Sequence, residues 1–251
     1  MRGKKDRRQG KHVLGAILIG FSAVVIATAL ILTSTESSSP PPNQTVLLID
    51  VTDPLSAQER TSLTNKISIL FSSSPNTTFS VYEIVDDPTK PPSPVTDETS
   101  PLKTVANVNP LAEHRSDIED DWKASTSSLM TGIDQATQGK PSQRSPILES
   151  VQWVALRELT APQAISVPRK LIIVSDLLQH TEEFSLYKGI PDFSLLKSNP
   201  NYGKLKTNLV DVDVELWVLR NHTKDATKLA DLWRRIIFDQ GGTVSKIVPI
   251  P

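Results

Sequence analysis

Two short apolar runs that each lead into an acid stand out in the pattern of hydrophobic and polar positions. The first run, residues 46–49, ends at Asp50, and the second, residues 171–174, is followed by Ser175 and Asp176. A continuous apolar run of this length between polar residues is typical of a strand buried on both faces of a parallel sheet. Because ligands bind beyond the carboxyl ends of such strands, Asp50 and Asp176 stand where a functional site is expected.

Helical and strand patterns alternate through the rest of the chain. Ser56 and Glu59 have the spacing of a capping box at a helix start, and apolar residues recur at helical spacing through residues 57–71. Together these features predict an amphipathic helix over residues 57–71. The same reasoning predicts further strands at 78–85, 210–219 and 244–248, and further helices at 116–139, 145–159 and 229–237. Residues 86–101 are predicted as a long surface loop, 102–108 as a short edge strand and 177–206 as irregular. The alternation indicates an α/β fold with a doubly wound, mostly parallel sheet and helices on both faces.

The N-terminal part of the chain has the pattern of a membrane anchor. Residues 13–32 are apolar and uncharged, and they are long enough to cross a bilayer as one transmembrane helix. Residues 1–12 carry six basic residues and one acid, so this end is expected in the cytoplasm and the body in the periplasm or outside the cell. Residues 33–44 are rich in serine and proline and are expected to form a linker. A cleaved signal peptide stays open as an alternative, because residues 27–29 fit a cleavage site.

Composition narrows the function classes open to the body, residues 45–251. The formal net charge of the 251-residue chain is -1, so its charge gives no reason to expect nucleic-acid binding. The chain has no cysteine, which excludes disulfides, thiolate metal sites and cysteine nucleophiles. The length of the body suits one α/β domain with a sizeable core.

Four oxygen-bearing side chains are candidates for a single site: Asp50, Thr52, Ser145 and Asp176. If the two acid-ended strands are neighbours, their carboxylates converge at one rim of the sheet. Thr52 in the first loop and Ser145 at a predicted helix start add hydroxyl oxygens. An all-oxygen set suits Mg²⁺, Mn²⁺ or Ca²⁺ rather than zinc. The alternative is that these side chains only cap backbone amides of their own loops and helix.

These residues resemble the von Willebrand factor A-like (vWA-like) family. The match rests on Asp50 and Thr52 after an apolar strand, Ser145 at a helix start and Asp176 at the end of a later strand. The family folds as a doubly wound sheet and often holds a divalent ion at a metal-ion-dependent adhesion site. Its pattern is Asp-x-Ser-x-Ser, then a threonine, then an aspartate that is usually followed by glycine. The resemblance covers residues 45–251.

The chain departs from the family pattern at several positions. Pro54 replaces the second serine of the first loop, with Asp53 beside it and Ser56 two residues late. Ser145 stands where the family has threonine, and Leu177 stands where it usually has glycine. The site that the resemblance implies is therefore either a working adhesion site or a degenerate one.

The resemblance implies a binding protein and no enzyme: a membrane-anchored protein–protein interaction module that presents this site to a partner. An acidic side chain of the partner would complete the coordination of the ion. One alternative is a metal-independent structural subunit of an envelope assembly. The other is a metal-dependent phosphoryl hydrolase with Asp50 as nucleophile. That reaction needs a second acid, but Thr52 stands where the haloacid dehalogenase-type pattern has it, and no glycine-rich phosphate loop occurs.

Overall fold

The computed structural model describes residues 40–251 apart from 85, 88, 93, 110–112, 139–140, 162–165 and 220–224. The predicted basic tail, the predicted anchor and residues 33–39 of the predicted linker lie outside the described residues. Within the described part of the chain, no helix is both long enough and apolar enough to cross a membrane. Residues 41–251 form one compact unit.

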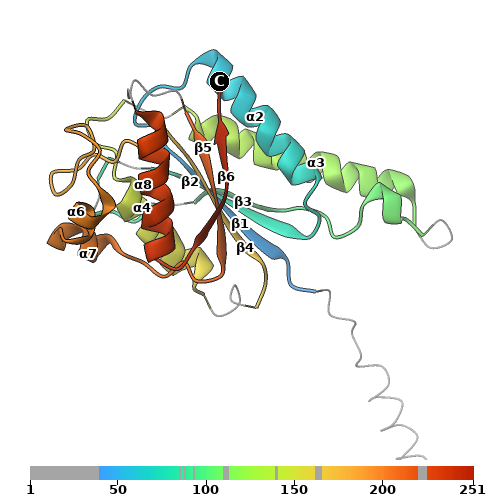
Figure 1. The fold of residues 1–251 in the computed structure, drawn as a ribbon. Coiled ribbons are helices and arrows are strands. Elements are labelled where there is room, and N and C mark those ends of the chain that lie inside the picture. Colours follow the sequence, from blue (N-terminus) through green and yellow to red (C-terminus); the bar gives the residue numbers. More distant parts are fainter. Residues whose placement is uncertain are drawn as a thin grey trace, which may run out of the picture. The chain divides into compact units, whose positions relative to one another are not determined.

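The unit is built on a mostly parallel sheet, which confirms the predicted α/β class (Figure 1). Its strands in the described chain are β1 Asn43–Ile49, β2 Thr77–Glu83, β3 Pro94–Thr99, β4 Arg169–Ser175, β5 Val212–Val218 and β6 Thr243–Pro249. They lie in the order β3-β2-β1-β4-β5-β6, and the β2–β3 pair is antiparallel while the others are parallel. The chain order reverses between β1 and β4, so the carboxyl ends of these two central strands meet at the switch point of the sheet.

Helices cover both faces of the sheet (Figure 1). α2 Ala57–Ser72 and α3 Arg115–Ala136 pack on one face. α4 Ile147–Val154, which continues as the π-helical turn Ala155–Leu159, and α8 Ala226–Asp239 pack on the other face. The smaller elements are α6 Phe193–Lys197, α7 Pro200–Leu205 and the 3₁₀ turn η1 Val105–Asn107.

β1 shows why an unbroken apolar run predicts a central strand. Its side chains alternate between two cores: Val46 and Leu48 pack under α4 and α8, whereas Leu47 and Ile49 pack under α2 and α3. All four side chains are fully buried. Because successive side chains of a strand point to opposite faces, only a strand covered on both sides can be apolar at every position.

The structure corrects three of the sequence-based predictions. Residues 86–101, predicted as a loop, contain β3, and residues 102–108, predicted as a strand, contain the turn η1 instead. The stretch 177–206 is not wholly irregular, because it contains α6 and α7. β3 is a polar edge strand that begins at a proline, so it lacks the apolar alternation on which strand prediction depends.

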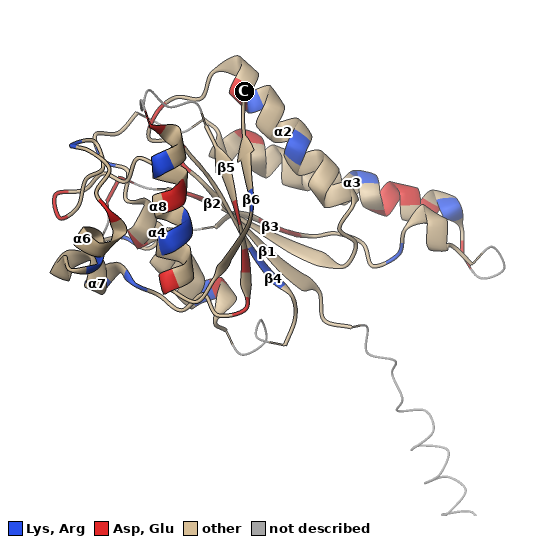
Figure 2. Cartoon of the chain, viewed as in Figure 1, with Lys and Arg blue, Asp and Glu red and all other residues tan. Residues whose placement is uncertain are grey.

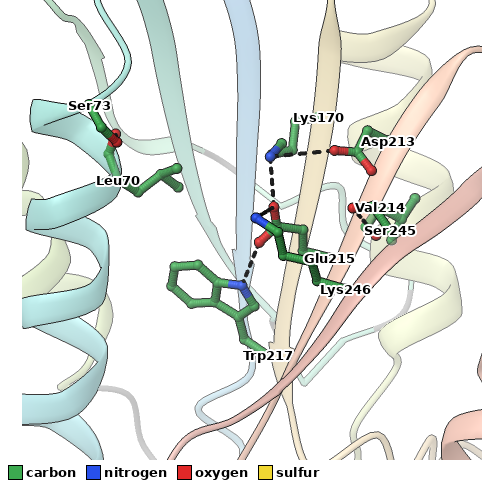
Figure 3. Close-up of polar contacts among 9 residues, drawn as sticks. All are labelled: Leu70, Ser73, Lys170, Asp213, Val214, Glu215, Trp217, Ser245 and Lys246. Atoms are coloured by element: carbon green, nitrogen blue, oxygen red, sulfur yellow. Dashed lines mark hydrogen bonds and ion pairs between the residues drawn. The ribbon is translucent and has the colours of Figure 1, made fainter.

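A charged cluster lies on the α2 face of β4, β5 and β6 (Figure 3). Glu215 is only 3% exposed, and its carboxylate accepts from Lys170 Nζ at 2.7 Å, Trp217 Nε1 at 3.0 Å and Lys246 Nζ at 3.2 Å. Asp213 contacts Lys170 at 3.4 Å and is more exposed. The negative charge of Glu215 is therefore shared by two lysines on the same face of the sheet.

Replacement of Glu215 by glutamine is expected to lower the free energy of unfolding by about 2 kcal/mol, since it keeps the shape but removes the buried negative charge that Lys170 and Lys246 share. Asp213→Asn is the matched control, and it should cost less than half as much because this carboxylate is partly exposed. Urea unfolding of both variants measures the difference. Equal losses would contradict the central role of Glu215.

The same variant has a predicted pH dependence. Burial would raise the pKa of Glu215, but hydrogen bonds from Lys170 and Trp217 and the charge of Lys170 lower it below its usual value of 4.5. A carboxyl group with a lowered pKa stabilises the fold above its unfolded-state pKa, and this contribution is lost as the pH falls through the folded-state value. The stability difference between the native chain and Glu215→Gln should therefore shrink as the pH falls below about 4.5.

Gly132 of α3 lies so close to β3 that a Cβ atom there would be 2.2 Å from Thr96 Cγ2 and 2.5 Å from Thr96 Cβ. Gly132→Ala should therefore lower the free energy of unfolding by about 1–3 kcal/mol, because helix and strand must move apart. Gly203 of α7 has no atom within 4 Å of such a Cβ, so Gly203→Ala is a control that should be close to neutral. Urea unfolding that finds Gly132→Ala as stable as the native chain would contradict this close packing.

Candidate functional site

Asp50, the residue after β1, gathers three hydroxyl groups around its carboxylate. Its Oδ1 accepts from Thr52 Oγ1 at 2.6 Å and from the Thr52 amide at 3.1 Å. Its Oδ2 accepts from Ser145 Oγ and Ser175 Oγ, both at 2.8 Å. Asp50 is 5% exposed, so this carboxylate is buried and satisfied entirely by the protein's own donors. The three hydroxyls come from the loop after β1, the approach to α4 and the end of β4.

Main-chain pairing fixes the positions of these three hydroxyl groups. β1 and β4 run in parallel register, and the Asp50 amide donates to the Val174 carbonyl at 2.8 Å, which brings Ser175 beside Asp50. Ser145 is held by two main-chain hydrogen bonds with His180, of 2.8 and 2.9 Å. α4 begins at Ile147, and the Ser145 side chain is bonded to Asp50 rather than capping a helix amide. The predicted helix start at Ser145 is therefore two residues too early.

Asp176, the fourth predicted residue, lies beside this cluster. Its Oδ1 accepts from the Leu178 amide at 2.8 Å. Leu177, between them, has a φ of 65°, a left-handed conformation that is uncommon for a bulky side chain. The Leu177 carbonyl accepts from the indole of the buried Trp233 at 2.8 Å, which anchors this turn to α8. Strained backbone of this kind is found preferentially at functional sites.

Asp50, Thr52 and Asp176 line one pocket of 540 Å³. The other residues that line it are Asp53, Pro54, Leu55, Ser56, Glu59, Leu178, Tyr187 and Leu219. Four of these lining residues are acids, and none of those described is basic. The pocket at the switch point of the sheet therefore carries an uncompensated negative charge.

The ionisation of the pocket residues reflects this charge. Burial, together with the nearby charges of Asp50 and Asp53, raises the pKa of Asp176 to about 7. Burial and the charges of the same three aspartates raise the pKa of Tyr187 to about 12. Asp176 is hard to ionise because it is buried beside other acids. A cation bound in the pocket would favour the ionised form of this carboxyl group.

The hydrogen bonds to Asp50 determine how the Thr52 and Ser145 hydroxyl groups can interact with a ligand. A hydroxyl has one hydrogen and two lone pairs. Thr52 and Ser145 give their hydrogens to Asp50, so their oxygens present only lone pairs to anything else in the site. Within the described residues, no group of three or more histidine, aspartate or glutamate side chains has metal-binding geometry. A cation at this rim would therefore depend on these hydroxyl oxygens as well as on carboxylates.

The structure thus brings Asp50, Thr52 and Ser145 into direct contact and places Asp176 in the same pocket as Asp50 and Thr52. Sequence reasoning did not identify Ser175 as a member of the site, although Ser175 is fully buried and bonds directly to Asp50. The available signal was a hydroxyl directly after the apolar run 171–174. Ser56 lines the pocket while its hydroxyl caps Glu59, as the predicted capping box requires.

Asp50→Ala is expected to lower the free energy of unfolding by about 3 kcal/mol, because it leaves three hydroxyl groups and one amide without their acceptor. Ser175→Ala should cost about 1 kcal/mol, since it removes a single bond. Asp53→Ala is the control, because Asp53 lines the same pocket but is exposed. Chemical unfolding of the three variants checks the order. If Asp50→Ala and Asp53→Ala prove equally stable, Asp50 does not organise this rim.

Comparisons with known proteins add no further assignment to this geometry. No protein-family model and no curated protein matches the chain.

Proposed function

We propose that residues 41–251 form a vWA-like interaction module in which Asp50, Thr52, Ser145 and Asp176 hold a divalent cation. The observation that carries the proposal is the acidic pocket at the switch point, which Asp50, Thr52 and Asp176 line without a described basic residue. The Ser145 hydroxyl donates to the Asp50 carboxylate beside this pocket. Hard-oxygen sets of this kind suit Mg²⁺, Mn²⁺ or Ca²⁺. The ion would supply an electrophilic centre for an acidic side chain of a partner protein.

The conformation of Leu177 supports the resemblance to the vWA-like family. The family usually has glycine after its last aspartate, and glycine is the residue that adopts positive φ without cost. Leu177 follows Asp176 and keeps a φ of 65°. Leu177 is not a glycine, but its backbone has a conformation that glycine adopts without cost. The doubly wound arrangement of the strands agrees with the family as well.

Pro54 replaces a ligand serine of the family pattern, and two neighbours are candidates to take its place. The Ser56 hydroxyl already accepts from the Glu59 amide at 3.2 Å, so it is committed to the helix cap. Asp53 is exposed and lines the pocket. We assign Asp53 as the acid that offsets the missing serine. With one fewer protein hydroxyl, binding of the ion should be weak and should depend strongly on the partner's acid.

The alternatives fit the pocket less well. A phosphoryl hydrolase needs a cationic clamp for the phosphate, and none of the described residues that line the pocket is basic. A metal-independent structural subunit would have no use for the excess of acid at the rim. The predicted N-terminal anchor would tether the module to a membrane, with the N-terminus in the cytoplasm and the body exported.

Calorimetric titration of the fragment 41–251, which contains all the described core residues, with Mg²⁺, Mn²⁺ and Ca²⁺ tests the proposal. Saturable binding is expected with a Kd of roughly 0.1–1 mM, as in weak extracellular sites. Asp176→Ala should weaken binding at least about tenfold, because a carboxylate ligand is lost. Asp121→Ala, an exposed acid on α3, is the matched control and should leave it unchanged. Absence of heat from a folded fragment, or equal binding by Asp176→Ala, would overturn the metal site.

A further inference from the structure

A second hollow is lined by a different set of residues from the acidic pocket and has the opposite charge. This α8 groove has a volume of 760 Å³. It is lined by Phe193 and Lys197 of α6, by Arg234, Arg235, Phe238 and Asp239 of α8, and by Gly242, Thr243 and Val244 at the start of β6. α8 packs on the face of the sheet opposite to α2 and α3, and basic and acidic residues alternate along this helix (Figure 2).

The α8 groove has an excess of positive charge. Three basic residues line it against one acid, Asp239, which leaves a net charge of two. Asp239 is already engaged by Lys197 at 2.7 Å and by Lys206 at 2.8 Å. Burial would raise the pKa of Asp239, but these lysines lower it to about 2, so it stays ionised and occupied. Lys206 adds a further cation beside the groove.

Among the described cations that line the groove, Arg234 is the one without an ion-pair partner in the described part of the protein, so it is open to a ligand. Arg235 pairs with Asp231 along the helix at 3.1 Å, whereas Arg234 is exposed and forms no ion pair with any described residue. A guanidinium group presents several donors in a fixed plane, which matches a carboxylate with two parallel hydrogen bonds. The groove is therefore complementary in charge and geometry to a carboxylate-bearing ligand.

The α8 groove also has an apolar surface. Phe238 is 81% exposed, which is exceptional for a large aromatic side chain on a folded domain. Phe193 lines the same groove and is only partly buried against the core. Aromatic side chains flanked by arginine are the composition that dominates binding energy at protein interfaces.

The third feature is the open edge of the sheet. β6 is the last strand in the sheet order, and within the described chain no strand pairs with its outer side. Half of the main-chain groups of such a strand point away from its neighbour and can pair with another extended chain. Thr243 and Val244, at the start of β6, line the groove itself.

We propose that the α8 groove binds an extended, acidic segment of a partner protein. Carboxylates of that segment pair with Arg234 and Arg235, an apolar side chain packs against Phe238, and its main chain runs along the start of β6. A peptide fits these observations better than a membrane, because the surface is hollow and includes an open strand edge, which a lipid headgroup cannot use. This surface is independent of the proposed metal site.

Selection of short random peptides displayed on phage against the full-length chain tests this proposal. EDTA is present throughout, so that no ion at the acidic pocket can bind carboxylates. The selected peptides should be rich in aspartate and glutamate and contain an aromatic or aliphatic residue. Arg234→Glu and Phe238→Ser should each weaken their binding about tenfold or more, as expected for interface hot spots.

Arg60→Glu is the matched control, because Arg60 is an exposed arginine of α2 on the other face of the sheet, and it should leave binding unchanged. Asp176→Ala should also leave it unchanged, which separates this surface from the metal site. Failure to select acidic peptides, or equal binding by Arg234→Glu, would overturn the proposal. Binding of phosphatidylglycerol vesicles that requires Arg234 and Phe238, without peptide binding, would replace the peptide with a lipid surface.

Discussion

The buried carboxylate of Asp50 is the interaction on which the rim of the sheet depends. A carboxylate that is 5% exposed loses most of its hydration, and such a group persists only when hydrogen bonds replace the lost water. Three hydroxyls and an amide do this here: one hydroxyl and the amide belong to Thr52, two residues along the chain, whereas Ser145 and Ser175 come from distant segments. The Asp50 side chain therefore links the loop after β1, the end of β4 and the segment before α4 through hydrogen bonds.

The central part of the fold could be predicted because burial dictates its sequence. β1 and β4 are covered on both faces, so residues 46–49 and 171–174 are all apolar and the pattern has no other simple explanation. β3 could not be predicted in this way. It is a half-exposed edge strand, held by pairing with β2 and by the close approach of Gly132 to Thr96, and these are tertiary contacts that leave no local periodicity.

Some residues of the candidate site could likewise be predicted from the sequence, and others could not. Asp50 and Asp176 could be found because an acid at the end of an apolar strand is conspicuous, and Thr52 and Ser145 followed from their spacing and from the family resemblance. Ser175 could not, because a small residue at a strand end is common and only the parallel register of β1 and β4 turns it toward Asp50. The positive φ of Leu177 could not be predicted either, because leucine rarely adopts a left-handed backbone conformation.

Opposite charges on two separate surfaces give the molecule two distinct binding chemistries. The acidic pocket at the switch point favours a cation, whereas the basic, aromatic groove beside α8 favours a carboxylate. Electrostatic complementarity of this kind contributes more to the choice of partner than to affinity. The two proposed sites together predict a module that engages two partners of different chemistry.

Anomalous diffraction from crystals of residues 41–251 grown with Mn²⁺ tests the central claim most directly, because it locates the ion without reference to any activity. We expect a manganese peak at the rim of the sheet, beside the Asp50 and Asp176 carboxylates and the Thr52 and Ser145 hydroxyls. A well-ordered rim with the Asp50 hydrogen bonds intact and no manganese peak would contradict it. The hydrogen-bonded cluster around Asp50 would then stabilise the fold without binding an ion.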